Sequence, residues 1–237
     1  MKKILLLTTI PMIACSAFGS EADDVKAAAK KLGNNYSWHT TVAVPEGGQS
    51  RFRAGPTDGK TDESGNIWLS MTRGENTTQA VLKGDKGAAK VEGEWRSLAD
   101  LSQDGGGQPG PGSFVARMLR NYKAPATEAG DLAAKTKSLK KEGDVYAGDL
   151  TEEGAKELLS FRGGRSGGQG AAAPTNAKGS AKFWIKDGQL SKYEYKVSGT
   201  VNAGGQDRDI DRTTTVEIKD VGSSKVEVPE DAKKKLS

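Results

Sequence analysis

Turn residues interrupt the chain at short intervals, and this pattern constrains the fold more than any other feature. Between residues 36 and 98, clusters of Gly, Asn and Asp separate short runs in which apolar and polar residues alternate. Alternation places successive side chains on opposite faces of a strand, and Gly and Asn supply the backbone conformations of hairpin turns. The sequence therefore predicts an antiparallel meander.

The expected strands of this meander are residues 36–44, 51–54, 66–73, 77–82, 88–92 and 94–98. Residues 56–59, with the sequence PTDG, have the composition of a turn between two of them. Toward the C-terminus the alternating pattern returns. It predicts a hairpin over 138–141 and 144–150, and further strands over 181–186, 190–202, 209–219 and 225–228.

Helical patterns flank and divide these strands. Ser20 followed by Asp23 resembles a capping box and predicts a helix that ends at residues 33–35. Ser113 is a good N-cap for a second helix, and Thr151 for another over residues 152–161. Residues 128–135 are expected to add a short helix, and Pro229 a terminal helical turn.

Two glycine-rich stretches match no element, and we expect them to be flexible loops within a single domain that spans residues 20–237. These stretches, 103–112 and 163–179, hold eleven of the 31 glycines. From residue 20 onward only 34 of 218 residues are Leu, Ile, Val or Phe, which is below the level of about 20% at which disorder becomes a concern when the net charge is high. Here the net charge is low and the alternation is regular, so we expect a folded chain. So thin a core favours one curved antiparallel sheet with a few helices on one face, an α+β fold, over a closed sandwich.

The first nineteen residues have the features of a secretory signal peptide that is removed. Two lysines precede an apolar run over residues 4–14, which as a helix is too short to span a membrane. Cys15 ends this run and resembles the acylated cysteine of a bacterial lipobox; the alternative is an ordinary cysteine in a discarded peptide. We therefore expect an exported protein of the periplasm or outer envelope, which is lipid-anchored if Cys15 is acylated.

Charge and composition exclude several classes of partner. Removal of residues 1–19 takes away two lysines, so 33 basic residues remain against 31 acidic ones and the net charge falls from +4 to +2. The charges of both signs are interspersed, whereas a nucleic-acid-binding protein needs a basic face. One cysteine and one histidine leave no disulfide framework and no cysteine-built zinc site. We expect no nucleic acid partner, no metal and no cofactor.

No enzyme signature survives its sequence context, so a non-enzymatic protein is expected. Residues 54–61 match a loose P-loop pattern, but a turn follows in place of the required helix. Asp207, Asp209 and Asp211 begin like a calcium loop, but the twelfth position is Ile218 where a glutamate is needed. His39 is the sole histidine, and a secreted hydrolase would need a polar cleft and a nucleophile beside it.

The tryptophans are the best candidates for binding residues. In residues 66–72 Trp68 points away from the face that carries Ile67 and Leu69, and Trp184 is opposed to its apolar neighbours in the same way. A sheet with tryptophan on both faces either packs helices over one of them or presents aromatic rings to a ligand. The candidate ligand-wall residues are Trp38, Trp68, Trp95 and Trp184; burial under a helix or loop is the alternative.

Two segments carry a family resemblance. Residues 83–98 (KGDKGAAKVEGEWRSL) and 179–201 (GSAKFWIKDGQLSKYEYKVSGTV), followed by VEVPEDA, are similar to segments of LolA-like and LppX/LprG-like carrier proteins. The resemblance implies a strongly curved, incompletely closed antiparallel barrel with helices over its concave side around an apolar cavity. It implies a cavity that carries acyl chains or lipidated proteins between membranes, and it supplies no catalytic or ligand residue.

Two functions of different class follow. The first is an extracytoplasmic binding protein whose partner is a lipid, an acyl chain or a lipidated protein, with membrane association through an N-terminal lipid anchor. The second is an envelope structural or interaction protein of the same fold, with a filled core and no small ligand. The volume and lining of the space beneath the helices would distinguish the two.

Overall fold

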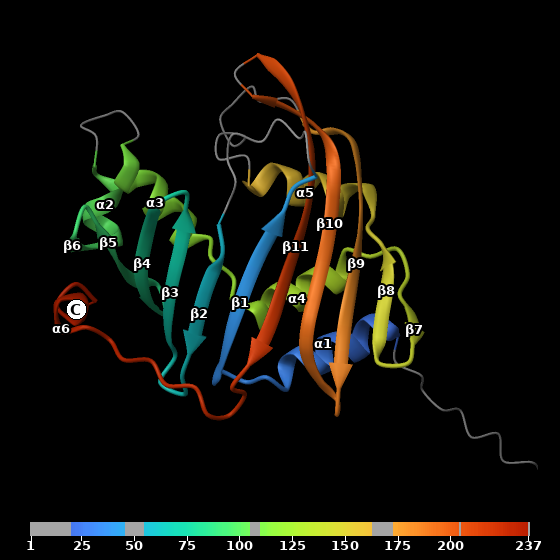
Figure 1. The fold of residues 1–237 in the computed structure, drawn as a ribbon, viewed down its shortest axis with the longest axis horizontal. Helices are drawn as coiled ribbons and strands as arrows, with labels where there is room; N and C mark the ends of the chain where they lie inside the picture. The colour runs from blue at the N-terminus through green and yellow to red at the C-terminus, as the bar shows by residue number, and fades with distance from the viewer. Residues whose placement is uncertain (1–19, 46–54, 105–109, 163–172, 204, 237) are drawn as a thin grey trace, which may run out of the picture.

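One antiparallel sheet of eleven strands dominates the computed structural model, which describes residues 20–45, 55–104, 110–162, 173–203 and 205–236 (Figure 1). Its order is β6-β5-β4-β3-β2-β1-β11-β10-β9-β8-β7. Within the described chain β6 and β7 end the sheet without pairing to each other, so the sheet is open. The predicted α+β fold with an incompletely closed antiparallel sheet is confirmed.

The meander forms the first half of the sheet, as the turn pattern predicts. It consists of β1 (Tyr36–Ala43), β2 (Thr57–Thr61), β3 (Asn66–Arg73), β4 (Asn76–Lys83), β5 (Lys86–Val91) and β6 (Glu94–Ser97). Gly74 and Gly84 lie in two of its hairpin turns with φ of +60°, a conformation that glycine adopts without steric cost.

The second half contains the longest strands. They are β7 (Lys140–Glu142), β8 (Val145–Asp149), β9 (Thr175–Lys186), β10 (Gln189–Ala203) and β11 (Gln206–Lys219). β1 pairs with β11, and Thr40 lies opposite Val216 in this register. This pairing brings the first and last strands of the chain together at the middle of the sheet.

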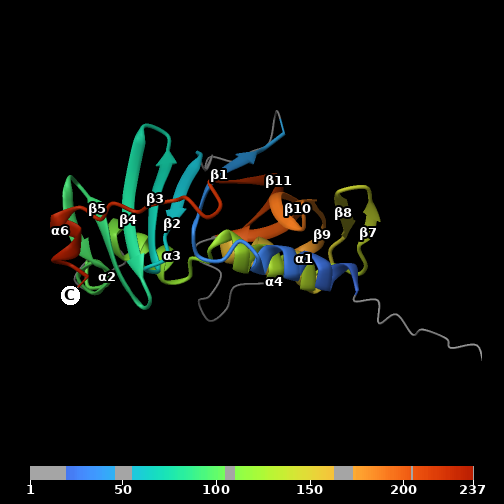
Figure 2. The ribbon, with the colours of Figure 1, turned by 90° about the horizontal axis from the view of Figure 1, so that it is seen from below.

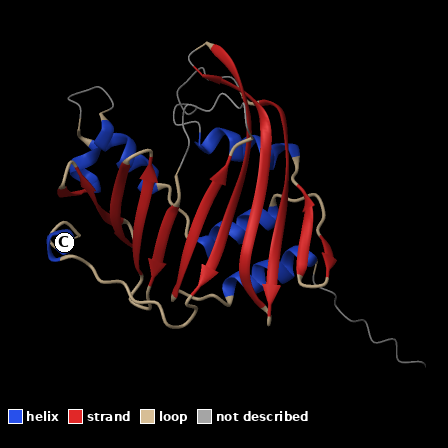
Figure 3. Cartoon of the chain, viewed as in Figure 1, coloured by secondary structure: helices blue, strands red, loops and turns tan. Residues whose placement is uncertain are grey.

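The helices gather on one face, which we call the inner face (Figures 2 and 3). They are α1 (Glu21–Lys30), α2 (Leu98–Ser102), α3 (Pro111–Arg120), α4 (Pro125–Ala134) and α5 (Glu152–Arg162). A short α6 (Glu230–Lys233) near the C-terminus lies apart from this group. α1 and α4 pack on each other and on β9, α5 packs on β9 and β10, and α2 and α3 pack on β5. The helices thus contact mainly the two flanks of the sheet.

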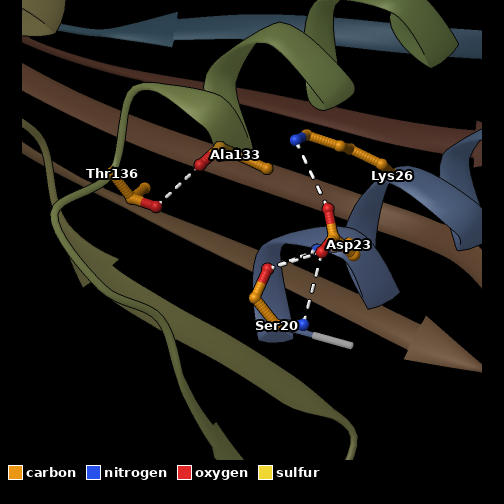
Figure 4. A network of polar contacts seen from close by, with 5 residues as sticks. All are labelled: Ser20, Asp23, Lys26, Ala133 and Thr136. Carbon is orange, nitrogen blue, oxygen red and sulfur yellow. Dashed lines mark hydrogen bonds and ion pairs between the residues drawn. The ribbon is translucent and has the colours of Figure 1, made fainter. Parts of the chain in front are cut away.

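Helix α1 begins with the predicted capping box (Figure 4). The Ser20 hydroxyl accepts a hydrogen bond from the Asp23 backbone N–H, and the Asp23 carboxylate accepts one from the Ser20 N–H, both at 3.3 Å. Hydrogen bonding to Ser20 lowers the pKa of Asp23. These contacts satisfy N–H groups that a helix start leaves without partners. α1 therefore begins directly after the predicted signal peptide.

The predicted turn over residues 56–59 is wrong, because these residues lead into β2. Gly59 lies opposite Trp38 in the sheet, and a Cβ atom added there would lie 2.0 Å from Cζ2 of the Trp38 ring. Gly59 therefore makes room for an aromatic side chain. The segment PTDG has the composition of a turn, but its last three residues belong to β2. The strand expected over 51–54 lies outside the described residues.

The two glycine-rich stretches are partly ordered, which corrects their predicted extent. Residues 175–179 belong to β9, where a Cβ on Gly179 would lie 2.3 Å from the Lys196 carbonyl oxygen, so glycine permits close strand packing. Pro111 begins α3 after Gly110 as N-cap, and Ser113, the expected cap, donates its hydroxyl to the Gly110 carbonyl. Residues 105–109 and 163–172 lie outside the described residues.

The chain after β11 crosses the face opposite α1 and α4, which we call the outer face, and ends in α6 beside β6 (Figure 2). Residues 225–228 form no strand, which corrects that prediction: they run across the sheet and not along a strand. Val81 and Ala88 point to the outer face and are fully buried, as is Ala232 of α6. We infer that this C-terminal segment covers them.

No helix in the described part of the chain combines the length and the apolar character needed to cross a membrane.

Candidate functional site

The four tryptophans lie on two faces of the sheet. Trp38 points to the inner face and is buried. Trp68, Trp95 and Trp184 point to the outer face by their register with neighbouring strands, and all three are half-buried. The predicted opposition of Trp68 and Trp184 to their apolar neighbours is confirmed, and the structure does not bring the four rings together. Their role in ligand binding stays a prediction.

The outer tryptophans have neighbours of different kinds. Trp68 lies opposite Val81, next to the patch that the C-terminal segment covers. Trp95 lies opposite Lys90 on the neighbouring strand. The Lys192 ammonium lies 4.5 Å from the ring centroid of Trp184, which is a cation–π contact. The three outer tryptophans therefore contact neighbouring strands and lysine side chains, and Trp68 also lies near the C-terminal segment.

Trp38 lies in an aromatic group on the inner face. Its ring centroid is 5.5 Å from that of Tyr36 and 6.4 Å from that of Tyr122, on which it stacks with an interplanar angle of 19°. The ring also lies over Gly59 of β2. Offset stacked rings at such distances add about 0.5–1.5 kcal/mol to the stability that burial supplies. Trp38 thereby joins the end of α3 to the middle of the sheet.

A carboxylate sits among buried tyrosines next to this group. Glu128 of α4 accepts hydrogen bonds from the hydroxyls of Tyr193, at 2.5 Å, and Tyr195, at 3.2 Å, both on β10. The Tyr36 hydroxyl accepts a hydrogen bond of 3.2 Å from the backbone N–H of Ala126, in the first turn of α4. Three tyrosines of the sheet therefore hold α4 in place through polar contacts in an otherwise apolar core.

Burial raises the pKa of the Tyr193 phenol well above its usual value of 10.0, and the adjacent Glu128 carboxylate raises it further. Burial also raises the pKa of Tyr36. In both cases the low polarity of the core disfavours the charged phenolate. These phenols therefore remain neutral hydrogen-bonding groups in the folded protein.

This pKa shift predicts a loss of stability at alkaline pH. In the unfolded chain Tyr193 loses its proton near pH 10.0, whereas in the folded protein it keeps the proton to higher pH. Its contribution to the free energy of unfolding is therefore fully present below pH 10 and falls as the pH rises above it. Urea unfolding across this range should show a shallower alkaline decline for Tyr193→Phe; identical slopes for the two proteins would contradict the prediction.

The middle of the inner face carries apolar side chains that are only half-buried. We define the apolar strip as Val42, Met71, Val115 and Met118. Val42 and Met71 point inward from β1 and β3. On α3, Val115 and Met118 share the side that continues to Tyr122, which stacks on Trp38. The helices pack mainly on β5, β6, β9 and β10, which explains why this central strip is less covered than the flanks.

Two polar side chains of β11 border the strip. Arg212 points inward opposite Val197 and donates a hydrogen bond of 2.7 Å to the Leu158 carbonyl of α5. Thr214 lies two residues further along the same face, between Val42 and Tyr195. Thr214 is fully buried, and its hydroxyl has no hydrogen-bond partner within the described ranges.

His39 lies on the outer face and pairs with one carboxylate. Its Nδ1 is 2.7 Å from the Asp58 carboxylate, with both side chains exposed. Ser37, which lies two residues away on the same face of β1, donates its hydroxyl to Asp220 at 2.5 Å. Among the described residues no three His, Cys, Asp or Glu side chains are grouped to hold a metal ion.

Sequence reasoning identified Trp38 as a candidate but missed Glu128, Arg212 and Thr214. The pairing of Tyr193 with Tyr195 on one strand face was visible as alternation. No sequence pattern marked Glu128 as a half-buried polar residue, because a single glutamate on a short helix resembles any solvent-exposed residue. Its hydrogen bonds to β10 depend on how α4 crosses the sheet, which no local pattern encodes.

Among known proteins, only solved structures are similar to this chain. No protein-family model and no curated protein sequence matches the chain. Among solved structures the chain is similar to LprF from Mycobacterium bovis, with 12% identity over 89% of this chain and 96% of that chain and a TM-score of 0.41. It is also similar to the lipoprotein LppX from Mycobacterium tuberculosis, with 12% identity over 87% and 97% and a TM-score of 0.40.

A third similar structure is a LolA superfamily protein from Nitrosomonas europaea. Its identity to this chain is 13% over 93% of this chain and 98% of that chain, with a TM-score of 0.35.

Proposed function

We propose that this chain is an exported, non-enzymatic binding protein whose inner sheet face holds the acyl chain of a lipid or a lipidated protein. The observation that carries the proposal is the apolar strip. Val42 and Met71 lie on the sheet face that the helices cover, and Val115 and Met118 lie on α3, yet all four side chains keep contact with solvent. Half-exposed apolar side chains grouped on a covered face are typical of sites for apolar ligands.

The arrangement of the helices supports the same proposal. They pack mainly on the flanks of the sheet, which leaves the middle strands as the part of the inner face where a chain-like ligand would lie. Tyr122, which is half-buried and stacks on the buried ring of Trp38, adds an aromatic side chain on the α3 side of the strip. Each methylene group that such a ligand buries would contribute about 0.8 kcal/mol.

A pair of charge substitutions on one strand tests the proposal. Val42→Asp places a carboxylate in the apolar strip, whereas Thr41→Asp places one on the outer face beside it. We expect Val42→Asp to weaken binding of a fluorescent fatty acid at least tenfold, because it would bury a charge against the acyl chain. Thr41→Asp should bind like the unaltered protein, and equal affinities for both variants would contradict the proposal.

A second candidate function is that of an envelope interaction protein with a filled core. The large buried side chains beneath α1 and α4 favour it: Tyr36, Tyr193 and Phe183 are each at most 1% exposed. That part of the inner face is packed solid. If no acyl probe binds and native mass spectrometry of the protein from a bacterial host finds no lipid, this second function replaces the first.

Export and anchoring form a separable part of the proposal. The basic start, the short apolar run and the small residues before Ser20 support removal of a signal peptide. If Cys15 is acylated, only residues 16–20 separate the anchor from α1, a reach of about 17 Å. The mass of the mature N-terminus should show either diacylated Cys15, abolished by Cys15→Ala, or a start at Ser20; an unprocessed Met1 would contradict export.

A further inference from the structure

We propose that Arg212 and Thr214 form a binding subsite for the anionic headgroup of an acyl-chain ligand. This inference rests on the proposed function, because it assigns the chemical class of the ligand in the same site. The subsite consists of a guanidinium and a buried hydroxyl on one strand face, next to the apolar strip. Such a ligand carries an oxyanion, either the carboxylate of a fatty acid or the phosphate of a lipid.

The first observation is the unsatisfied hydroxyl of Thr214. The residue is fully buried, and no described residue accepts from or donates to its Oγ1 atom. Burying a hydroxyl without a partner costs free energy, so such groups are uncommon in folded proteins and each requires an explanation. A ligand oxygen at this position would supply the missing hydrogen bond.

The second observation is the position of Arg212. It points to the same face of β11 as Thr214, roughly 7 Å away along the strand, with its guanidinium held toward α5 by the Leu158 carbonyl. A guanidinium presents five N–H donors in a planar fork that suits carboxylate and phosphate oxygens. Because this hydrogen bond already restrains the Arg212 side chain, little of its conformational freedom is lost when a ligand binds.

The surrounding charges agree with an anion at this place. The neighbouring ion pair of Lys196 and Asp211, at 3.2 Å, lies on the outer face. Glu128 lies beyond Tyr195 and accepts hydrogen bonds from two tyrosine hydroxyls. Val42 adjoins Thr214 and begins the apolar strip. A ligand can therefore place its headgroup at Arg212 and its chain along the strip, away from the Glu128 carboxylate.

Three probes of equal chain length test the subsite: dodecanoic acid, dodecyl phosphate and dodecanol, each titrated into the delipidated full chain. We expect at least one anion to bind tenfold or more tightly than the alcohol, and the preferred anion identifies the source of the headgroup. Arg212→Gln should reduce this preference to within twofold. Lys182→Gln, which removes an exposed cation from the outer face, should leave the preference unchanged.

Thr214→Val separates a binding role from a structural one. Valine has nearly the same shape, so removal of an unsatisfied hydroxyl should leave the melting temperature unchanged or raise it, while anion affinity falls severalfold. A lowered melting temperature with unaltered affinity would overturn the subsite, as would equal binding of anion and alcohol. Failure of all three probes to bind would instead overturn the proposed function.

Discussion

Trp38→Ala is expected to lower the free energy of unfolding by about 3–5 kcal/mol, the usual cost of removing a large buried aromatic side chain. The ring is 3% exposed and packs between Tyr36, Tyr122 and the backbone of Gly59. Its removal would leave a cavity at the centre of the sheet and release the end of α3. Denaturant unfolding monitored by circular dichroism would measure the change.

A double-mutant cycle with Gly59 makes this prediction specific. Gly59→Ala alone should destabilise the protein by about 1–3 kcal/mol, because the added methyl group overlaps the Trp38 ring. In the Trp38→Ala background the same methyl group would occupy the cavity and cost little, so the two effects should not add. Additive effects would show that Trp38 does not lie on Gly59.

Glu128→Ala is expected to produce the second large effect, a loss of about 2–4 kcal/mol. It leaves the hydroxyls of Tyr193 and Tyr195 buried without their acceptor, and each unsatisfied group costs about 1–3 kcal/mol. Thermal or urea unfolding would measure the loss. Thr127→Ala, at an exposed site on the same helix, should change stability by less than about 0.5 kcal/mol.

A combined variant tests the reason for this loss. Glu128→Leu together with Tyr193→Phe and Tyr195→Phe removes both donors and the acceptor of these two hydrogen bonds at once, so neither bond leaves one partner behind. It should recover most of the stability that Glu128→Ala loses, because replacing both partners of a buried hydrogen bond is often nearly neutral. A triple variant less stable than Glu128→Ala would contradict this explanation.

The fold was largely predictable from local patterns. Alternation and hairpin glycines identified most strands, because a strand with one buried face must place apolar residues at every second position. The capping residues Ser20 and Thr151 both accept hydrogen bonds from their helices. These features depend on neighbours within a few residues, which the sequence displays directly.

The failures share a physical cause, which is packing between distant segments. Gly59 resembled a turn residue because its partner, the Trp38 ring, comes from another strand. Gly179 resembled part of a flexible loop, although it allows close approach to the Lys196 backbone. In both cases glycine is needed because a side chain would clash with a neighbouring segment, and not because the backbone adopts an unusual conformation. Composition alone cannot distinguish these two reasons for a glycine.

The candidate site was predictable only in part for the same reason. Trp38 was recognisable as a large aromatic residue on an alternating strand. Arg212 and Thr214 lie in a charged and polar stretch that resembled a solvated strand face, and only pairing with β1 and β10 shows that they point inward. A shift of the register by one residue would have placed both on the outer face.

Quenching of tryptophan fluorescence by a brominated fatty acid tests the central claim, binding on the inner face, most directly. In a variant with Trp68→Phe, Trp95→Phe and Trp184→Phe, the only remaining indole is Trp38 on the inner face. We expect saturable quenching of Trp38 in this variant, and none in a variant that keeps only Trp184 on the outer face. Quenching of Trp184 with Trp38 unaffected would contradict it.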